Sequence, residues 1–346
     1  MAKPGMQAAG GVQSYRGTLE VESLGTTLIH EHVFVLNPEL ERNLPSPGWD
    51  ERTMIDLAVD ELNRLSELGV ESVVDLTVPG LGRDVQLVAR VAEQAAVNLL
   101  ASTGWYTPNV LPTFFQFHGP GRLLDGPDPL EALFIGDIER GIAGTGVRAA
   151  MLKVMTDADG MTPDVERIMS AAATAHQQTG VPITTHSHPA SRNGLVQQAF
   201  FQKRGVTLDR VIIGHCGDTE DLDYLRELME NGSAIGLDRF GMEHVLSDAR
   251  RIDVLLALLE GGYADRLVLS HDAAFYSHVT PPAWRAMHAP RWRMDNLHRR
   301  VIPMLRERGV GQAELDQMLV ENPRRLLAPM GGGAHAGNER HERGVR

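Results

Sequence analysis

The chain has 346 residues, and its 33 lysines and arginines against 45 aspartates and glutamates give a formal net charge of −12 at pH 7. This acidic balance argues against a nucleic acid or an anionic membrane as partner, because both are bound through basic patches. The single cysteine, Cys216, excludes an internal disulfide and a thiolate-rich zinc site. With no signal-peptide pattern and no apolar run of membrane-spanning length, we expect a soluble, cytoplasmic protein.

The two ends of the chain differ in composition from the region between them. Residues 1–11 are rich in alanine and glycine and are expected to form a flexible leader. Residues 330–346 contain a run of glycines and no periodic apolar pattern, so we expect a disordered tail. Residues 12–329 are expected to form one domain, which opens with a short hairpin over Val12–Val21 around an Arg16-Gly17 turn.

Eight short apolar runs alternate with longer helical patterns along this domain. They span Thr27–Leu36, Val70–Leu76, Val97–Ser102, Val147–Val154, Val181–His186, Arg210–His215, Ser233–Leu237 and Arg266–Asp272. Apolar strands that alternate with helices predict a parallel sheet covered on both faces, and eight such units favour a (β/α)8 TIM barrel. A doubly wound sheet is disfavoured, because no G-x-G-x-x-G motif opens a helix after an early strand.

The first of these runs carries the sequence His30-Glu31-His32 near its end. Side chains alternate along a strand, so a spacing of two places both imidazoles on one face and turns Glu31 to the other. In a barrel the chemistry lies at the carboxyl ends of the strands, where both histidines can point into the mouth. The alternative is that the two polar residues face solvent.

Later runs end in further polar side chains that suit a metal. His186 closes the fifth, His215 the sixth and Asp272 the eighth, while Lys153 lies near the end of the fourth. Each alone is a weak signal, but together they form a ring around one barrel mouth. A charged lysine there is costly, whereas a neutral lysine can react with carbon dioxide to form a carbamate, an anionic ligand able to bridge two cations.

These residues resemble the binuclear metal pattern of the phosphotriesterase family of amidohydrolases, from about Val21 to Ala328. The pattern comprises His30, His32, Lys153, His186, His215 and Asp272. Further motifs are similar to the phosphotriesterase-like lactonase branch, among them Leu28–His32, Asp75–Val78, Gly80–Arg83, Ile213–Asp218, Gly236–Gly241 and Ser270–Asp272. The resemblance implies two divalent metal ions, a homodimer and a small-molecule substrate. Zinc is the first expectation, and cobalt, manganese or iron also suit such ligands.

The resemblance also implies a role for each ligand. His30, His32 and Asp272 would hold the more buried metal, His186 and His215 the more exposed one, and Lys153, carboxylated on its side-chain nitrogen, would bridge the two. A hydroxide shared by the metals would attack a carbonyl or phosphoryl centre. Asp272 would then accept a proton and pass it towards the leaving group.

Two residues favour a lactone over an organophosphate as substrate. The phosphotriesterases proper carry a proton-transferring histidine after the seventh strand, where this chain has Arg239, which stays charged but can hydrogen-bond a lactone ring oxygen. Tyr106 resembles the family tyrosine that leans over the metal bridge. The alternatives are a surface ion pair for Arg239 and a packing role for Tyr106.

The leading hypothesis is therefore a hydrolase that opens acyl-homoserine, γ- or δ-lactones and has a promiscuous phosphotriesterase activity. A dedicated organophosphate triesterase (aryldialkylphosphatase) is the second hypothesis, and a non-catalytic metal-binding barrel is a remote third. Asp218 and His271 remain possible supports of the metal ligands, with the His271 side chain expected to face the helices.

Aromatic residues gather in two of the predicted connections. Phe275, Tyr276, Trp284 and Trp292 lie in or beyond the connection after the eighth strand, where we expect an apolar channel for an acyl chain. Phe114, Phe115 and Phe117 follow the third strand. For this second group a substrate channel and a dimer interface are equally open.

Overall fold

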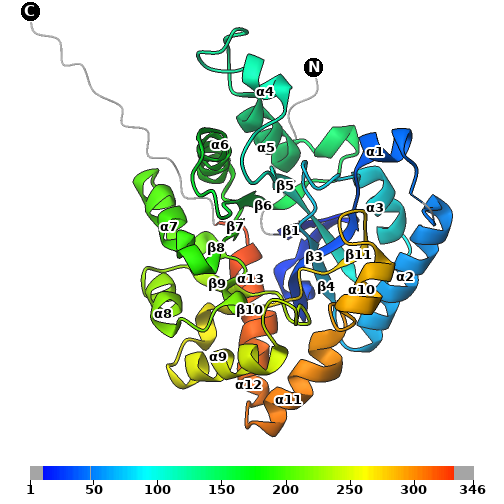
Figure 1. The fold of residues 1–346 in the computed structure, drawn as a ribbon, viewed down its shortest axis with the longest axis vertical. Coiled ribbons are helices and arrows are strands. Elements are labelled where there is room, and N and C mark those ends of the chain that lie inside the picture. The colour runs from blue at the N-terminus through cyan, green and yellow to red at the C-terminus, as the bar shows by residue number, and fades with distance from the viewer. Residues whose placement is uncertain (1–10, 47, 331–346) are drawn as a thin grey trace, which may run out of the picture.

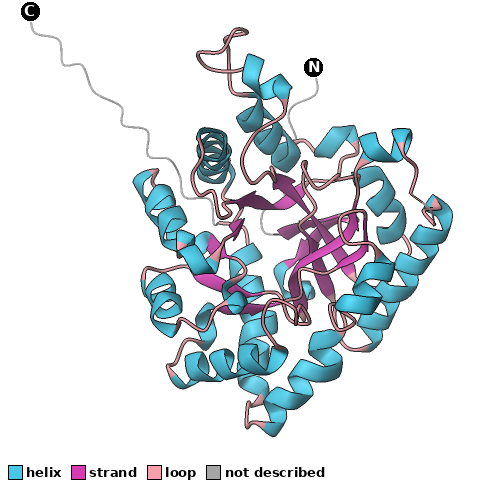
Figure 2. Cartoon of the chain, viewed as in Figure 1, coloured by secondary structure: helices cyan, strands magenta, loops and turns pink. Residues whose placement is uncertain are grey.

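Parallel strands at the centre of the molecule are surrounded by helices in the computed structural model, which describes residues 11–46 and 48–330 (Figure 1, Figure 2). Within these residues nine strands form one parallel sheet in the order β10-β9-β8-β7-β6-β5-β4-β3-β11. Their bounds are β3 (Thr27–Val35), β4 (Ser72–Asp75), β5 (Asn98–Gly104), β6 (Ala149–Met155), β7 (Ile183–His186), β8 (Val211–Ile213), β9 (Ala234–Leu237), β10 (Leu267–Leu269) and β11 (Ala274–Ser277). Nearly all residues of these nine strands are buried, as expected for a sheet that helices cover.

The eight predicted strands correspond to β3–β10, so the predicted TIM barrel is confirmed. Two predicted runs extend two or more residues past the carboxyl end of their strands: β8 ends at Ile213 and β10 at Leu269, before His215 and Asp272. These two residues have positive φ angles of 62° and 52°, a conformation that ends a strand. They therefore lie on the turns that follow the strands.

Backbone contacts between the two ends of the sheet close the barrel. The Asp272 N–H donates to the His30 carbonyl at 3.0 Å, and the His32 N–H donates to the Ala273 carbonyl at 2.9 Å. β11 then continues beside β3 with Ala274 opposite His32, an extra strand that the sequence analysis assigned to a connection. The segment that follows β10 thus pairs with β3, and this pairing closes the barrel.

Helices between the strands cover the outside of the barrel (Figure 2). They are α1 (Pro38–Asn43), α2 (Glu51–Glu67), α3 (Val85–Ala92), α4 (Thr113–Phe117), α5 (Pro129–Glu139), α6 (Pro163–Thr179), α7 (Asn193–Lys203), α8 (Leu222–Glu230), α9 (Asp248–Glu260), α10 (Pro282–His288), α11 (Ile302–Glu307), α12 (Gln312–Asp316) and α13 (Asn322–Leu327). Side-chain caps start several of them; the Asp50 carboxylate, for example, accepts from the Thr53 N–H at the start of α2. In the described residues no helix is both long and apolar enough to cross a membrane.

The predicted N-terminal hairpin is present as β1 (Gly11–Ser14) paired antiparallel with β2 (Gly17–Glu20). Val12 of this hairpin joins a buried apolar cluster with Ile29, Leu100, Met151 and Val268 from the barrel strands. This cluster fills the barrel interior with apolar side chains, as TIM barrels require. The predicted leader and tail lie outside the described residues, apart from Gly11 in β1 and Met330.

Candidate metal centre

His30 and His32 of β3 meet Asp272 at the barrel mouth. Both histidines are buried, with 1% and 5% of their surface exposed. Their Nε2 atoms lie 3.2 Å and 3.1 Å from the same Asp272 oxygen, Oδ1. The spacing of two in the sequence therefore does bring both imidazoles to one face, and the eighth-strand carboxylate faces them.

His186 and His215 form a second pair beside the first. The Nδ1 atom of His186 lies 2.8 Å from Nε2 of His215. The rings of His215 and His30 are 5.1 Å apart between centroids, so the two pairs are neighbours. The positive φ of His215 turns its side chain back towards the barrel axis from the end of β8.

Lys153 of β6 lies in the same cluster and is 1% exposed. Its Nζ atom is 3.2 Å from Nε2 of His30. Burial lowers the pKa of Lys153 to about 8, so roughly a tenth of the amines are neutral at pH 7. A neutral amine is the form that reacts with carbon dioxide, which makes this lysine suited to carboxylation.

The donor atoms of this cluster are close enough to share a metal ion. Ligand atoms of His30, His32 and Asp272 lie within 4.8 Å of one another, as do those of His30, His215 and Asp238. Imidazole nitrogens and carboxylate oxygens are ligands of zinc, cobalt, manganese and iron. The donor set therefore fits divalent cations.

Asp238, one residue beyond β9, supports histidines of both pairs and was missed by the sequence analysis. Its Oδ2 atom is 2.6 Å from Nδ1 of His30, and its Oδ1 atom is 3.1 Å from Nδ1 of His215. Burial opposes ionisation, but the charges of His215 and His30 outweigh it and hold the pKa of Asp238 well below its ordinary value. These contacts fix Nδ1 as the donor and leave Nε2 of both rings free to face the metal centre. A carboxylate one residue past a strand end was the available signal.

Arg239 joins Asp272 to a buried chain of ion pairs. The Arg239 Nε atom donates to Oδ2 of Asp272 at 2.9 Å, and its Nη1 atom donates to Asp218 at 2.8 Å. Asp218 in turn accepts from the fully buried Arg251 at 2.7 Å. Burial would raise the pKa of Asp272, but His30 and Arg239 outweigh it and hold that pKa well below its ordinary value. The Arg239 ion pair is therefore part of the site and not of the outer surface.

Tyr106 lies over the second histidine pair. Its ring centroid is 5.8 Å from that of His186, in an edge-to-face arrangement. Burial raises the pKa of Tyr106 to about 12, so the phenol keeps its proton and acts as a hydrogen-bond donor at neutral pH. Asp157, which the sequence analysis did not single out, lies 3.7 Å from Nε2 of His186 on the same side.

His271 faces the helices, as expected. Its Nδ1 atom is 2.6 Å from Glu31, and its Nε2 atom accepts from the Leu297 N–H at 2.9 Å. Neither of these ring contacts is to a candidate metal ligand. Asp218 contacts Arg239 and Arg251 and has no hydrogen bond to the histidines among the described residues.

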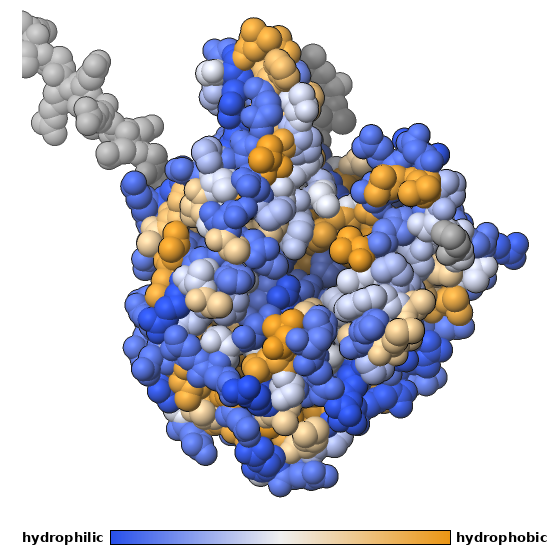
Figure 3. Space-filling model, in the orientation of Figure 1, coloured by the Kyte–Doolittle hydropathy of each residue, from blue (hydrophilic) through white to orange (hydrophobic). Residues whose placement is uncertain are grey.

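The aromatic residues after β5 and β10 are placed differently from one another. Phe115 packs on Trp105 at 4.8 Å between ring centroids, whereas Phe114 and Phe117 are 53% and 46% exposed. Figure 3 shows hydrophobic residues on the projecting segment that carries α4. After β10, the Trp292 side chain donates to the carbonyls of His271 and Asp272, so it supports the backbone of the site.

Comparison with known proteins places the chain in one family. The model of the phosphotriesterase family matches residues 10–327. The phosphotriesterase homology protein of Mycobacterium tuberculosis is 44% identical over 317 residues, which cover 92% of this chain and 97% of that protein. The aryldialkylphosphatase of Saccharolobus solfataricus is 35% identical, covering 90% of this chain and 98% of its own.

A more distant relative and a solved structure indicate the same family. The N-acetyltaurine hydrolase of Xenopus tropicalis is 24% identical over 92% of this chain and 98% of its own length. The solved structure of the phosphotriesterase from Mycobacterium tuberculosis superimposes with a TM-score of 0.90 at 43% identity, covering 92% of this chain and 99% of that one. With its barrel and its cluster of histidines, lysine and carboxylates at the strand ends, the chain belongs to the phosphotriesterase family of metal-dependent hydrolases.

Proposed function

We propose that residues 12–329 form a single catalytic domain that opens lactones with the help of two divalent cations, and that it hydrolyses organophosphate triesters more slowly. The observation that carries the proposal is that Arg239 and Tyr106 each lie beside a candidate metal ligand. Arg239 is bonded to Asp272, and the neutral phenol of Tyr106 lies beside His186. Both are hydrogen-bond donors at neutral pH, which suits the oxygens of a lactone ring.

In this proposal the candidate ligands divide into two sets. His30, His32 and Asp272 hold one cation, and His186 and His215 hold the other. Lys153, carboxylated on Nζ, provides the ligand between them. Bound divalent cations supply a water of lowered pKa and polarise the substrate carbonyl. Zinc is the expected metal, with cobalt, manganese and iron as alternatives.

The protein's own side chains then orient the substrate and move a proton. Asp272 is ionised, because its pKa is held well below the ordinary value, and in this proposal it is the group that accepts a proton from the attacking water. Arg239 holds Oδ2 of this carboxylate and keeps it aligned. Tyr106 donates its phenolic hydrogen to a ring or carbonyl oxygen of the lactone.

A dedicated organophosphate triesterase is the alternative, and the aryldialkylphosphatase among the relatives favours it. The experiment that separates the two compares kcat/KM for acyl-homoserine, γ- and δ-lactones with kcat/KM for an aryl dialkyl phosphate. We expect the lactones to be hydrolysed faster by at least about a hundredfold, close to 3 kcal/mol of transition-state binding. A higher value for the phosphate triester would reverse the assignment.

Two variants test the roles of Arg239 in the same assay. Arg239→Met should lower kcat/KM for lactones by about a hundredfold or more, because Asp272 loses its partner. Arg250→Met is the matched control, since Arg250 forms an exposed ion pair with Glu220 outside the site. Equal rates for both variants would remove Arg239 from the reaction.

Metal content tests the binuclear centre itself. Purified protein should contain close to two divalent ions per chain, and Lys153→Ala should lose metal and activity together. A small added carboxylate such as formate should restore part of both. One ion or none in the wild type, or full activity of Lys153→Ala, would contradict the proposed bridge.

A further inference from the structure

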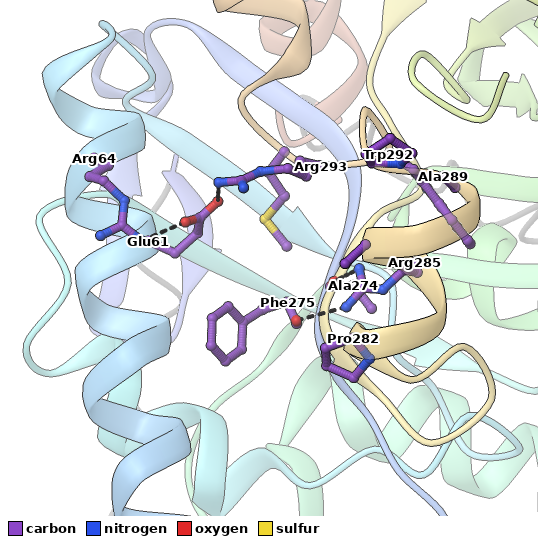
Figure 4. A pocket seen from close by; sticks show the side chains of 12 residues that line it. Glu61, Arg64, Ala274, Phe275, Pro282, Arg285, Ala289, Trp292 and Arg293 are labelled. Carbon is purple, nitrogen blue, oxygen red and sulfur yellow. Dashed lines mark hydrogen bonds and ion pairs between the residues drawn. The ribbon is translucent and has the colours of Figure 1, made fainter. Parts of the chain in front are cut away.

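A cavity of about 450 Å³ lies outside the barrel, between α2 and α10 (Figure 4). Its apolar wall includes Phe275, Pro282, Ala286 and Trp292. None of the candidate metal ligands lines it. Its volume is within the range of ordinary small-molecule sites, about 300 to 1,000 Å³.

Arg285 of α10 lines this cavity and forms no direct ion pair with a carboxylate among the described residues. It is 9% exposed, and its two terminal nitrogens donate to the carbonyls of Ala274 and Phe275. Among the described residues Glu61 is the carboxylate that acts on Arg285, from beyond ion-pair distance, and the Arg285 Nε has no hydrogen-bond partner. A buried charge without a direct counter-ion is costly, and an anionic ligand beside it would lower that cost.

Two more arginines line the cavity and both contact the carboxylate of Glu61, while Arg293 also pairs with Asp295 at 3.4 Å. Arg64 and Arg293 lie 2.6 Å and 3.5 Å from the two oxygens of Glu61 (Figure 4). The cavity wall therefore carries three guanidinium groups against one carboxylate. This positive site belongs to a chain whose formal net charge is −12.

An adjoining cavity of about 380 Å³ continues the positive surface. It shares Arg64, Pro290 and Arg293 with the first, and Asp295 is its one acidic lining residue among those described. The arginines that line it are Arg64, Arg291, Arg293, Arg299 and Arg300. Glu243 pairs with Arg291 and Asp295 with Arg299, but the arginines of this lining still outnumber their carboxylates, and an excess of positive charge attracts anions into a cleft.

We propose that the cavity between α2 and α10 binds a small organic anion, with its carboxylate or phosphate beside Arg285 and Arg293 and its apolar body against Phe275 and Trp292. Arginine matches both anions through bidentate hydrogen bonds, and the aromatic wall provides apolar contact for the remainder. A neutral ligand of the same length would leave the guanidinium groups unbalanced and would bind more weakly. The site is separate from the candidate metal centre and does not depend on the reaction proposed there.

Calorimetric titration of the full-length protein tests the proposal with four probes. Octanoate and hexyl phosphate carry both an anionic group and an apolar chain, octan-1-ol lacks the charge, and inorganic phosphate lacks the chain. We expect saturable binding of octanoate or hexyl phosphate and at least about tenfold weaker binding of the other two. The stronger of the two amphiphiles identifies the anionic group that the site prefers.

Arginine variants test whether the anion binds in this cavity. Arg64→Gln combined with Arg293→Gln should weaken binding by about tenfold or more, and both side chains are about half exposed, so the fold is kept. The matched control is Arg90→Gln, which removes an arginine of similar exposure that pairs with Glu51 on the other end of α2. Arg285→Met should abolish binding, with its thermal unfolding measured in parallel because Arg285 also holds two backbone carbonyls.

Two results would overturn the proposal. The first is the absence of saturable binding of either amphiphile to the wild type at millimolar concentration. The second is binding that is unchanged in the Arg64→Gln, Arg293→Gln double variant, which would locate the anion elsewhere, for example at the metal centre. Equal binding of octan-1-ol would likewise contradict an anion site.

Discussion

Asp238 connects the two halves of the candidate metal centre through one carboxylate. It accepts from the Nδ1 side of His30 and of His215, and also from the His215 N–H at 2.8 Å. A carboxylate behind a histidine ligand fixes its tautomer and its ring orientation. Because both halves depend on the same group, its loss would affect a cation held by either half.

Replacing Asp238 with asparagine should therefore weaken metal binding by about 10- to 100-fold, since a neutral amide orients the two rings less strongly. Competition with a metal chelator measures the affinity of each variant. Asp253→Asn is the control, because Asp253 forms an exposed ion pair with Arg308 far from the site. Unchanged metal affinity in Asp238→Asn would show that the histidines are oriented by other contacts.

His298 makes the stability of the fold depend on pH, independently of the candidate metal centre. Burial and the nearby His271 lower the pKa of His298 to about 4, from an ordinary value of 6.5. Below pH 6.5 the unfolded chain takes up a proton at this residue and the folded protein does not, so stability falls as the pH decreases towards 4. At about pH 5 the loss from this group is about 2 kcal/mol.

His298→Gln should remove this part of the pH dependence. Unfolding by urea at about pH 7.5 and about pH 5 measures it, and the variant should lose about 2 kcal/mol less than the wild type between the two. The same decrease in both proteins would mean that His298 is protonated in the folded state.

Among the elements, β3 determines how the barrel closes. Glu31 points away from the metal centre and is fully buried. It accepts hydrogen bonds from the Ser270 hydroxyl at 2.8 Å and from the N–H groups of His271 and Ala273 at 3.0 Å each. The Glu31 side chain of β3 thereby holds the segment after β10, which carries Asp272.

Glu31→Ala should destabilise the fold by about 3 to 5 kcal/mol, because several buried donors lose their acceptor at once. Thermal unfolding measures the loss, and Glu31→Gln should lie between the variant and the wild type. The control is Glu71→Ala, since Glu71 accepts a single backbone N–H, that of Thr26, at the exposed end of the barrel. If Glu31→Ala loses no more stability than Glu71→Ala, closure depends on the backbone pairing alone.

The sequence predicted eight of the nine strands but not β11, and the reason is local. Strand periodicity identifies apolar runs, and the run after β10 is interrupted at Asp272 by a positive φ angle that only tertiary contacts explain. The chain becomes extended again at Ala274, where it pairs with the edge of β3 that β4 leaves free. The sequence of residues 273–277 contains no pattern that predicts this pairing.

For the site, the residue types and their strand-end positions were sufficient to predict six side chains in one cluster. His30, His32 and His186 lie on strands, so their direction followed from alternation. Asp238 was missed because its contacts depend on the angle at which the chain leaves β9. The partners of Arg239 were missed for the same reason, since Asp218 and Asp272 come from two different connections, after β8 and after β10.

At the scale of the whole molecule, the segment that carries α4 extends from the barrel with exposed apolar side chains (Figure 1, Figure 3). They are Val110, Phe114, Phe117, Leu123 and Leu124, each between 46% and 79% exposed. A group of exposed apolar residues on a projecting segment is typical of a protein–protein interface. For Phe114 and Phe117 we therefore take the dimer interface, and not the substrate channel, as the prediction to test.

We predict that the protein is a homodimer and that Phe114→Ser combined with Phe117→Ser raises its dissociation constant at least about tenfold. Analytical ultracentrifugation measures the constant, and lactone KM is determined in parallel. Val196→Ser, which removes an equally exposed apolar side chain from α7, is the control. A raised KM for long-chain lactones with an unchanged oligomeric state would assign the segment to a substrate channel instead.

The shared carboxylate of Asp238 also has a thermodynamic consequence. When a first cation orders either His30 or His215, the same hydrogen bonds restrain the other ring before its own cation arrives. The second ion then binds to a partly ordered site and loses less conformational entropy on binding. Uptake of the two metals is therefore expected to be positively cooperative, and by reciprocity the removal of one loosens the other.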